Sequence, residues 1–238
     1  MKNPRAVFIE YRERFKLLYM ARERIHRELT DHGVNMRGHG FFDHDHPVAQ
    51  TCVLIHEDER SVRKAWVSSL LHSLDRLMTK EEENRTLDGL LALIPENEIS
   101  RFEIEEIRVA LQNHDGPNRE TDSITQKILQ DADRLANAQS IIILRSGQFM
   151  PNIPAIELGY LGMKNHPEST YKKPRTVHDN LMHILEWDPE GPEAHPQFCL
   201  RLPMAIEFGR PHFAYIREWI LRVKSDFAQL GLDPWPIE

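Results

Sequence analysis

The chain has 238 residues, of which 40% are hydrophobic and 28% charged, so it can bury one sizeable core or two small ones. This composition excludes a disordered or fibrous chain. Lysine and arginine number 30 against 37 aspartates and glutamates, which gives a net charge of −7. Because a negative field repels backbone phosphates, we expect no binding of long nucleic acids, although a local basic pocket is compatible with this charge.

The cysteines and the hydropathy pattern bear on the cellular compartment. Cys52 and Cys199 are too few and too far apart in sequence for a disulfide framework, which is typical of a reducing cytosol. No run approaches the ~20 apolar residues that a membrane span needs, and an acid interrupts the start of the chain too early for a secretory signal. We therefore expect a cytoplasmic protein without membrane partners.

The first predicted helix begins at Asn3, a capping residue, with Pro4 at the first helical position. From there apolar side chains recur at spacings of three, four or seven as far as Leu29, and Gly33 can end the helix. Residues 34–46 contain glycines and no helical period, so they are predicted to form a loop.

The same periodicity predicts further helices along the rest of the chain, and no pair of alternating segments flanks a hairpin turn. The class is therefore all-α, in the simplest case a single domain over residues 1–238. The helices are expected over about 47–55, 61–78, 100–111, 123–144, 177–187 and 198–230, the last with a kink at 209–211.

Two connecting segments are expected between these helices. The acidic run 80–84 is predicted to be a solvated connection. Residues 146–177 contain several glycines and prolines and no clear period, so we expect a long irregular segment there. Such segments often bind ligands.

Thirteen histidines stand out in the composition. Four segments combine histidine with acids or place acids in an apolar helix, and each alone is ordinarily a capping group or a solvated helix face. His72 and Asp131 differ, because apolar neighbours surround both and a buried imidazole or carboxylate needs a partner. Histidines and one carboxylate that converge from separate helices on a divalent metal would satisfy both. The four segments are 42–47, 70–76, 113–115 and 129–135.

At these residues the sequence resembles the HD-domain metal-dependent phosphohydrolases. The family pattern is an early His at the start of a helix, an apolar run that ends in His-Asp, and a later Asp that often stands in Asp-Ala-Asp-Arg-Leu. Phe42-Asp43-His44 resembles the first element and Leu70-Leu71-His72 the second. The segment Lys127-Ile-Leu-Gln-Asp-Ala-Asp-Arg-Leu135 resembles the third.

The resemblance implies an HD-like helical bundle, with its core over about residues 40–145 and the C-terminal helices 177–231 packed on that core. It implies hydrolysis of a small phosphate ester, such as a nucleotide. It also implies a divalent metal (Mn, Fe, Co, Ni, Zn or Mg) held by an early histidine, His72 and Asp131. His114 resembles a further family histidine, with a role at a second metal position or at the leaving phosphate.

The early ligand has two candidates. His44 fits the apolar spacing of the helix that follows, with Val48 four residues on, and this spacing favours it. His46 is the alternative, because Pro47 can mark the first helical position and His46 then borders the helix.

One position departs from the family pattern, since Ser73 stands where the family has a metal-binding aspartate. A neutral hydroxyl is a much weaker ligand for a hard cation. Asp75 is a candidate replacement, because position i+3 of a helix lies on the same face as His72, where Asp75 would ligate the metal or orient His72. The competing hypothesis is a catalytically degenerate protein that keeps the fold for ligand binding or regulation.

Three cations near these segments are candidates to bind substrate oxygens, namely Arg76, Lys127 and Arg134. The ordinary alternative for each is a charge on a helix surface. The irregular segment 146–177 is expected to help shape the substrate pocket.

Overall fold

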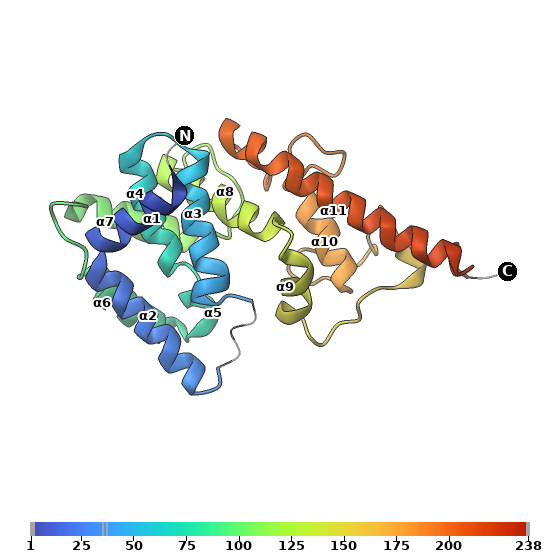
Figure 1. Cartoon of the computed structure of the whole chain (residues 1–238), viewed down its shortest axis with the longest axis horizontal. Helices are drawn as coiled ribbons and strands as arrows, with labels where there is room; N and C mark the ends of the chain where they lie inside the picture. The colour runs from blue at the N-terminus through green and yellow to red at the C-terminus, as the bar shows by residue number, and fades with distance from the viewer. Residues whose placement is uncertain (1–2, 35, 37, 237–238) are drawn as a thin grey trace. The chain divides into compact units, whose positions relative to one another are not determined.

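The computed structural model describes residues 3–34, 36 and 38–236. Over these residues the protein is helical and forms no β-strand beyond one isolated bridge between Thr170 and Lys173. The predicted all-α class is confirmed. The helices in chain order are α1 (Pro4–Arg14), α2 (Lys16–Asp31), α3 (His46–Ile55), α4 (Glu59–Leu71), α5 (Leu74–Leu77), α6 (Lys80–Leu91), α7 (Arg101–Asn113), α8 (Ile124–Ala138), α9 (Ile142–Phe149), α10 (Val177–Leu185) and α11 (Pro203–Gln229), with a π-helical turn η1 (Phe41–Asp45) and a 3-10 turn η2 (Leu158–Tyr160) (Figure 1).

The chain divides into two compact units. Unit 1 comprises the residues up to Ala136 together with 201–205, and unit 2 comprises 137–200 and the residues from Ile206 onward. The unit boundaries within secondary structure lie inside α8 and α11, which are each a single helix. The single domain over 1–238, and the packing of the helices 177–231 on the core 40–145, stay predictions.

The N-terminal segment forms two helices where one was expected. The Asn3 side chain caps α1 as predicted, by accepting hydrogen bonds from the backbone N–H groups of Arg5 and Ala6. The helix then breaks at Phe15, which has φ −108° and ψ 32°. The Phe15 side chain is fully buried and stacks on Trp66 with ring centroids 6.0 Å apart. Packing of this ring against the core accounts for the break.

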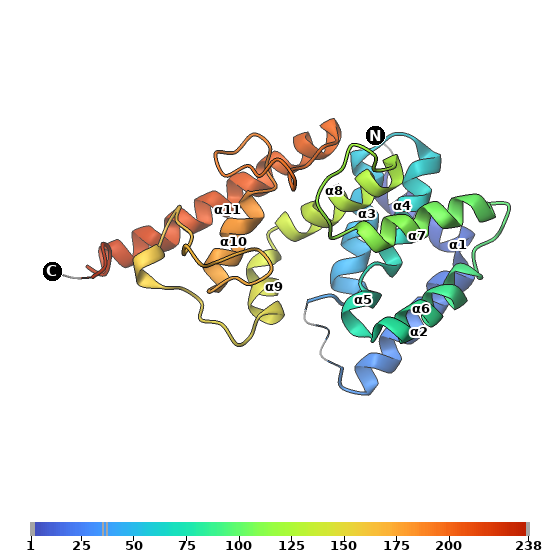
Figure 2. The same cartoon turned by 180° about the vertical axis from the view of Figure 1, so that it is seen from behind.

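Helices α3 and α4 form the centre of unit 1 and lie side by side (Figures 1 and 2). Helix α4 ends at Leu71, earlier than the predicted end at residue 78, and two turn residues separate it from the short helix α5. Segment 42–47 leads into the start of α3, and segment 70–76 contains the end of α4. Both segments therefore belong to unit 1.

The acidic run 80–84, predicted to be a connection, begins helix α6 instead. Thr79 and Glu82 form a capping box, in which the Glu82 carboxylate accepts the backbone N–H of Thr79 at 3.0 Å. Acidic side chains in the first turn of a helix interact favourably with its positive end. The acidic run that predicted a solvated segment therefore stabilises the N-terminus of α6.

In unit 2 the irregular segment is shorter than expected, because α9 continues to Phe149. Residues 150–176 contain no helix other than the turn η2. Helix α10 follows and is buried along its length from His178 to Leu185. Helix α11 continues through Pro211.

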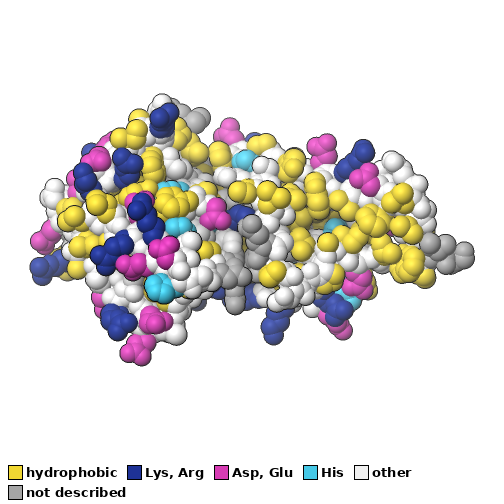
Figure 3. Space-filling model, turned by 60° about the horizontal axis from the view of Figure 1, so that its bottom comes forward, with side chains coloured by type: hydrophobic (Ala, Val, Ile, Leu, Met, Phe, Trp, Pro, Cys, Tyr) yellow, Lys and Arg dark blue, Asp and Glu magenta, His cyan; other side chains and the backbone are white. Residues whose placement is uncertain are grey.

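Acidic and basic side chains lie close together on the face that Figure 3 shows, and hydrophobic side chains also reach the surface there. Exposed arginines on α2 and α11 pair with carboxylates one turn away, as in Arg24–Glu28 at 3.1 Å and Arg222–Asp226 at 3.0 Å. Such exposed pairs contribute little to stability.

Not one of the described helices combines the length and the apolar character that crossing a membrane requires.

Candidate metal centre

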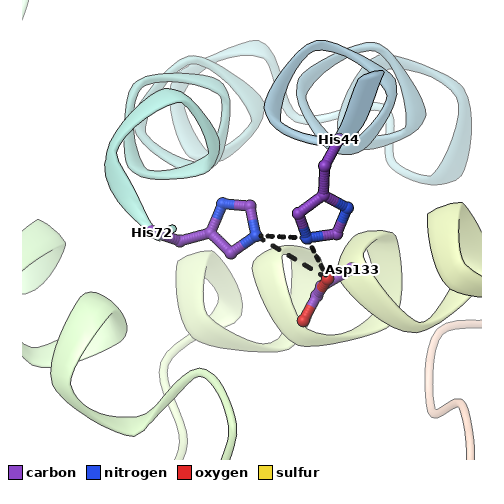
Figure 4. A group of neighbouring side chains, drawn as sticks. All are labelled: His44, His72 and Asp133. Carbon is purple, nitrogen blue, oxygen red and sulfur yellow. Dashed lines mark hydrogen bonds and ion pairs between the residues drawn. The ribbon is translucent and has the colours of Figure 1, made fainter. Parts of the chain in front are cut away.

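His44 lies in the π-helical turn η1, directly before α3. Its backbone N–H donates to the Gly40 carbonyl at 2.9 Å, and its side chain is buried. A Cβ at Gly40 would meet the Asp43 carboxylate, so any other residue there would require the exposed Asp43 side chain to move. Single π-helical turns are frequent at functional sites, and this one directs His44 toward the interior of unit 1 (Figure 4).

His72 is the first residue after α4. Its Nδ1 lies 2.6 Å from the Ser69 carbonyl oxygen, and because a carbonyl only accepts, Nδ1 must carry the proton. The other ring nitrogen, Nε2, is therefore the atom available to a metal. The break after α4 and this hydrogen bond together orient the His72 ring.

Three ligand atoms from three segments of unit 1 converge (Figure 4). His44 Nε2 lies 3.1 Å from His72 Nε2, and Asp133 Oδ1 lies 3.3 Å from the first and 3.7 Å from the second. With these separations a point exists about 2 Å from all three atoms, which is the usual distance from a divalent metal to histidine nitrogen or carboxylate oxygen. The geometry therefore suits a metal ion.

The electrostatics of the cluster also favour an added positive charge. Burial alone would raise the pKa of Asp133, but hydrogen bonds from His44 and His72 hold that pKa well below its usual value. Burial likewise opposes a charge on His72, yet the Asp133 carboxylate outweighs it and raises the pKa of His72 to about 9. A bound cation would take the place of this proton.

The carboxylate in the cluster is Asp133, and the predicted ligand Asp131 does not join it. Two residues along a helix correspond to about 200°, so the two side chains leave α8 on opposite faces. Asp131 Oδ2 accepts the backbone N–H groups of Arg201 and Leu202, both at 2.8 Å. Asp131 therefore holds the segment 201–205 against α8, and the structure brings Asp133, not the predicted Asp131, to His44 and His72.

His46 also lies apart from the cluster. Its ring stacks on Tyr19, with centroids 5.5 Å apart, and packs edge-on against Phe8 and Phe41. Burial lowers the pKa of His46 to about 4, so the ring is neutral at pH 7. Of the two candidates for the early ligand, the structure brings only His44 to His72 and Asp133.

Ser73 is bonded to another acid of the early segment. Its hydroxyl donates to Asp45 Oδ1 at 2.5 Å, while Asp45 Oδ2 pairs with Arg22 at 2.7 Å. Burial raises the pKa of Asp45 to about 6, although Arg22 opposes this shift. Asp45 Oδ1 is also 3.6 Å from His72 Nδ1, on the side of the ring away from Nε2. Asp45 thus supports His72 from behind, and Ser73 contacts Asp45.

Asp75, predicted to replace the missing aspartate, is not part of the cluster. The prediction assumed a continuous helix, whereas two turn residues, 72 and 73, separate α4 from α5. The Asp75 carboxylate instead lies 3.4 Å from the guanidinium of Arg76.

Two further histidines flank the cluster. The His114 ring lies 5.3 Å from that of His72 and the His39 ring 5.1 Å from that of His44, measured between centroids. His114 Nδ1 donates to the Leu111 carbonyl at 2.7 Å, in the same i−3 relation as His72 to its own carbonyl partner. The structure brings the predicted His114 to the site, whereas His39 was not predicted.

Two of the three predicted substrate-binding cations pair with other residues. Arg76 pairs with Asp115 at 3.2 Å, and Arg134 donates to Asn118 at 2.8 Å. Lys127 is half-buried on α8, four residues before Asp131 and hence on the face away from the metal cluster. These placements leave substrate binding by the three side chains a prediction.

Comparisons with known proteins bear on the fold. No protein-family model matches the sequence, and no curated protein is similar to it. Among solved structures, the chain is similar to a protein of Lactobacillus plantarum whose crystal structure was determined as a structural genomics target. The two share 15% identity with a TM-score of 0.62, over 89% of this chain and 97% of the other. At this identity the likeness shows a shared helical fold and nothing of the function.

Proposed function

We propose that the protein is a metal-dependent phosphohydrolase of the HD type that acts on a phosphate ester such as a nucleotide. The observation that carries the proposal is the convergence of His44 Nε2, His72 Nε2 and the Asp133 carboxylate within metal-ligand distance of one point. The order of these residues along the chain also follows the HD pattern, with the second aspartate of Asp-Ala-Asp-Arg-Leu as the carboxylate.

The donor set suits a catalytic ion. Structural zinc sites are closed by four protein ligands, whereas catalytic sites have three and keep a position open for water or substrate. Two imidazoles and one carboxylate are compatible with Zn, Mn, Fe, Co or Ni. When bound there, such an ion would polarise a phosphoryl oxygen and lower the pKa of its water.

The surrounding residues have separate tasks in this proposal. The Ser69 carbonyl fixes the His72 ring, and Asp45 supports the same ring from behind. Asp133 supplies a single negative charge, so a site with a divalent cation stays positive and attracts a phosphate ester. His114, whose ring lies 5.3 Å from that of His72, would give a proton to the leaving oxygen.

A second candidate function is favoured by Ser73. Because a serine stands where the resembled family has an aspartate, the cluster contains one carboxylate where that family supplies two. A site of this kind can hold a metal or a phosphate without hydrolysing an ester, as the degenerate alternative requires.

The two candidates are separated by metal analysis and a substrate screen. Protein purified without a histidine tag is treated with chelator, reloaded with each divalent ion, and incubated with a panel of phosphomonoesters, phosphodiesters and nucleotides while released phosphate or alcohol is measured. Metal binding with hydrolysis supports the enzyme. Metal binding without hydrolysis of any ester supports the degenerate protein.

The site assignment is tested in the same assay. Asp133→Asn is expected to lose the metal, whereas Asp88→Asn, a control on the exposed surface of α6, should retain it. Metal affinity of Asp133→Asn equal to that of the unmodified protein would contradict the assignment.

A further inference from the structure

Unit 2 contains a second cluster of reactive side chains that the metal centre does not use. It consists of Ser169, in the irregular segment before α10, and two residues of α10 and its C-terminal cap, His183 and Glu186. His183 is buried, Ser169 is half-buried, and the Glu186 side chain is 24% exposed. All three belong to unit 2.

The hydrogen bonds of the cluster have a defined direction. His183 Nδ1 lies 2.5 Å from Glu186 Oε1, and because an ionised carboxylate only accepts, Nδ1 carries the proton. In the neutral imidazole, His183 Nε2 is then an acceptor, and it lies 3.1 Å from Ser169 Oγ. The serine hydroxyl therefore donates to Nε2. A nucleophile bonded to a base, which a third group orients, is the arrangement of serine hydrolases.

The backbone around Ser169 fixes its position. The Ser169 N–H donates to the His166 carbonyl at 2.9 Å, and Thr170 and Lys173 exchange two backbone hydrogen bonds at 3.0 and 3.3 Å. These bonds form a tight turn that carries the serine. Because the orientation of this serine relative to the base is already set, it loses little further conformational entropy when it reacts.

We propose that Ser169 is a nucleophile that accepts acyl groups from esters, with His183 as general base and Glu186 as the group that orients it. In the acylation step Ser169 Oγ forms a bond to the carbonyl carbon and its proton passes to His183 Nε2. The ester C–O bond breaks, and the departing alkoxide takes that proton. Water then hydrolyses the acyl serine by the same route, so that ester and water give acid and alcohol.

One backbone donor contacts the serine side chain. The Arg175 N–H donates to Ser169 Oγ at 3.4 Å. Each donor to the oxyanion of an acyl-transfer intermediate is worth about 10²–10³ in rate, and an N–H bound to Oγ is not such a donor, so slow acylation is expected. Covalent labelling is therefore a more sensitive test than turnover.

The experiment incubates the full chain with a fluorophosphonate probe and locates the adduct by intact-mass and peptide mass spectrometry. The serine oxygen attacks phosphorus, fluoride leaves, and His183 takes the proton. We expect one adduct, on Ser169, which is absent from Ser169→Ala. Ser225→Ala, a control on α11, should be labelled like the unmodified protein. Thermal denaturation of Ser169→Ala verifies that the variant is folded.

Two further variants test the base and its partner. His183→Gln and Glu186→Gln are each expected to lower the labelling rate by about 10²-fold or more. Because Glu186 is partly exposed, its variant keeps the test valid if His183→Gln does not fold. Absence of any adduct on the unmodified protein, an adduct that persists in Ser169→Ala, or an unchanged rate in Glu186→Gln would each overturn the proposal.

Discussion

Ser73 stands where the resembled family has a metal-binding aspartate, and its hydroxyl donates to Asp45 at 2.5 Å. Asp45 is fully buried, and its charge is balanced by Arg22. A second carboxylate at position 73 would face Asp45 with no cation of its own, and two carboxylates that share a site disfavour joint ionisation. Serine fits this position because it donates a hydrogen bond that an ionised aspartate cannot.

An aspartate at position 73, as in the resembled family, should therefore destabilise this protein. Ser73→Asp is expected to lower the free energy of unfolding by about 3 kcal/mol or more, because it buries an uncompensated charge beside Asp45. Ser73→Ala, which only loses a hydrogen bond to a charged group, should cost less, about 1.5–3 kcal/mol. Urea denaturation at pH 7 measures both. Full stability of Ser73→Asp together with tighter metal binding would show that position 73 is a ligand position.

The aromatic surroundings of His46 predict a specific acid sensitivity. Burial lowers the pKa of His46 to about 4, whereas an unfolded histidine titrates near about 6.5. Between these values the unfolded state binds a proton that the folded state does not, so stability falls as the pH falls through this window. His46→Phe retains an aromatic ring without a titrating group, and it should lose less stability between pH 7 and pH 5. Parallel pH profiles of melting temperature for the two proteins would contradict this.

Among the helices, α8 contributes side chains to two different sets of contacts. Asp133 on one face joins the metal cluster, and Asp131 on the opposite face binds the backbone of residues 201 and 202. Leu129 and Ala136, which lie on the Asp133 side, are buried as fully as Ile128. Because both faces are buried, hydrophobic periodicity could not indicate which aspartate faces the site.

Because Asp131 and Asp133 have different contacts, the same change to asparagine should affect stability at one position and metal binding at the other. Asp131→Asn is expected to lower the free energy of unfolding by about 1–3 kcal/mol, since it weakens charge-assisted hydrogen bonds to two buried N–H groups. Its metal stoichiometry should stay unchanged. Denaturation and metal analysis of Asp131→Asn, beside Asp133→Asn, measure the contrast. Loss of metal from Asp131→Asn while the protein remains folded would return Asp131 to the ligand set.

Apart from α6 and most of α9, the helices could be predicted from periodicity, but the breaks at Phe15 and after α4 could not. Tyr11, Phe15 and Leu18 are all buried, so the apolar stripe continues across the break between α1 and α2 and leaves no signal in the sequence. The same holds at the end of α4, where Leu70 and Leu74 are both fully buried on either side of the turn.

The candidate site was predictable where a residue stood in an apolar helix or at its border. His44 and His72 met that condition. His39 lies in a loop without a period, and Asp45 sits beside two histidines in a charged run, so neither had a pattern to identify it. Contacts that join segments far apart in the chain, such as Asp45 to Arg22, become visible only in three dimensions.

At the scale of the whole molecule, the two proposed sites belong to different units. His44, His72 and Asp133 are in unit 1, and the Ser169 cluster is in unit 2. Substitutions at separate sites with no shared partners usually act additively. A substitution at one site should therefore leave the activity of the other unchanged. The fluorophosphonate probe should label Ser169 of Asp133→Asn at the rate of the unmodified protein.

Metal binding should stabilise the folded protein as a whole. An ion that binds only the folded state at 100 times its dissociation constant adds about 2.7 kcal/mol to the free energy of unfolding. We expect the melting temperature of chelator-treated protein to rise when Mn²⁺ or Zn²⁺ is added, and Asp133→Asn to show no rise. Differential scanning calorimetry measures both. An equal rise in the variant would place the stabilising ion elsewhere.

The central claim is that His44, His72 and Asp133 hold one metal ion. Anomalous scattering from crystals of manganese-loaded protein, measured with a chelator-treated crystal as the control, tests this most directly. The account predicts a single strong peak at about 2.0–2.3 Å from His44 Nε2, His72 Nε2 and an Asp133 oxygen. A peak at Asp131 or Asp75, or no peak in unit 1 of protein that contains manganese by mass spectrometry, would contradict it.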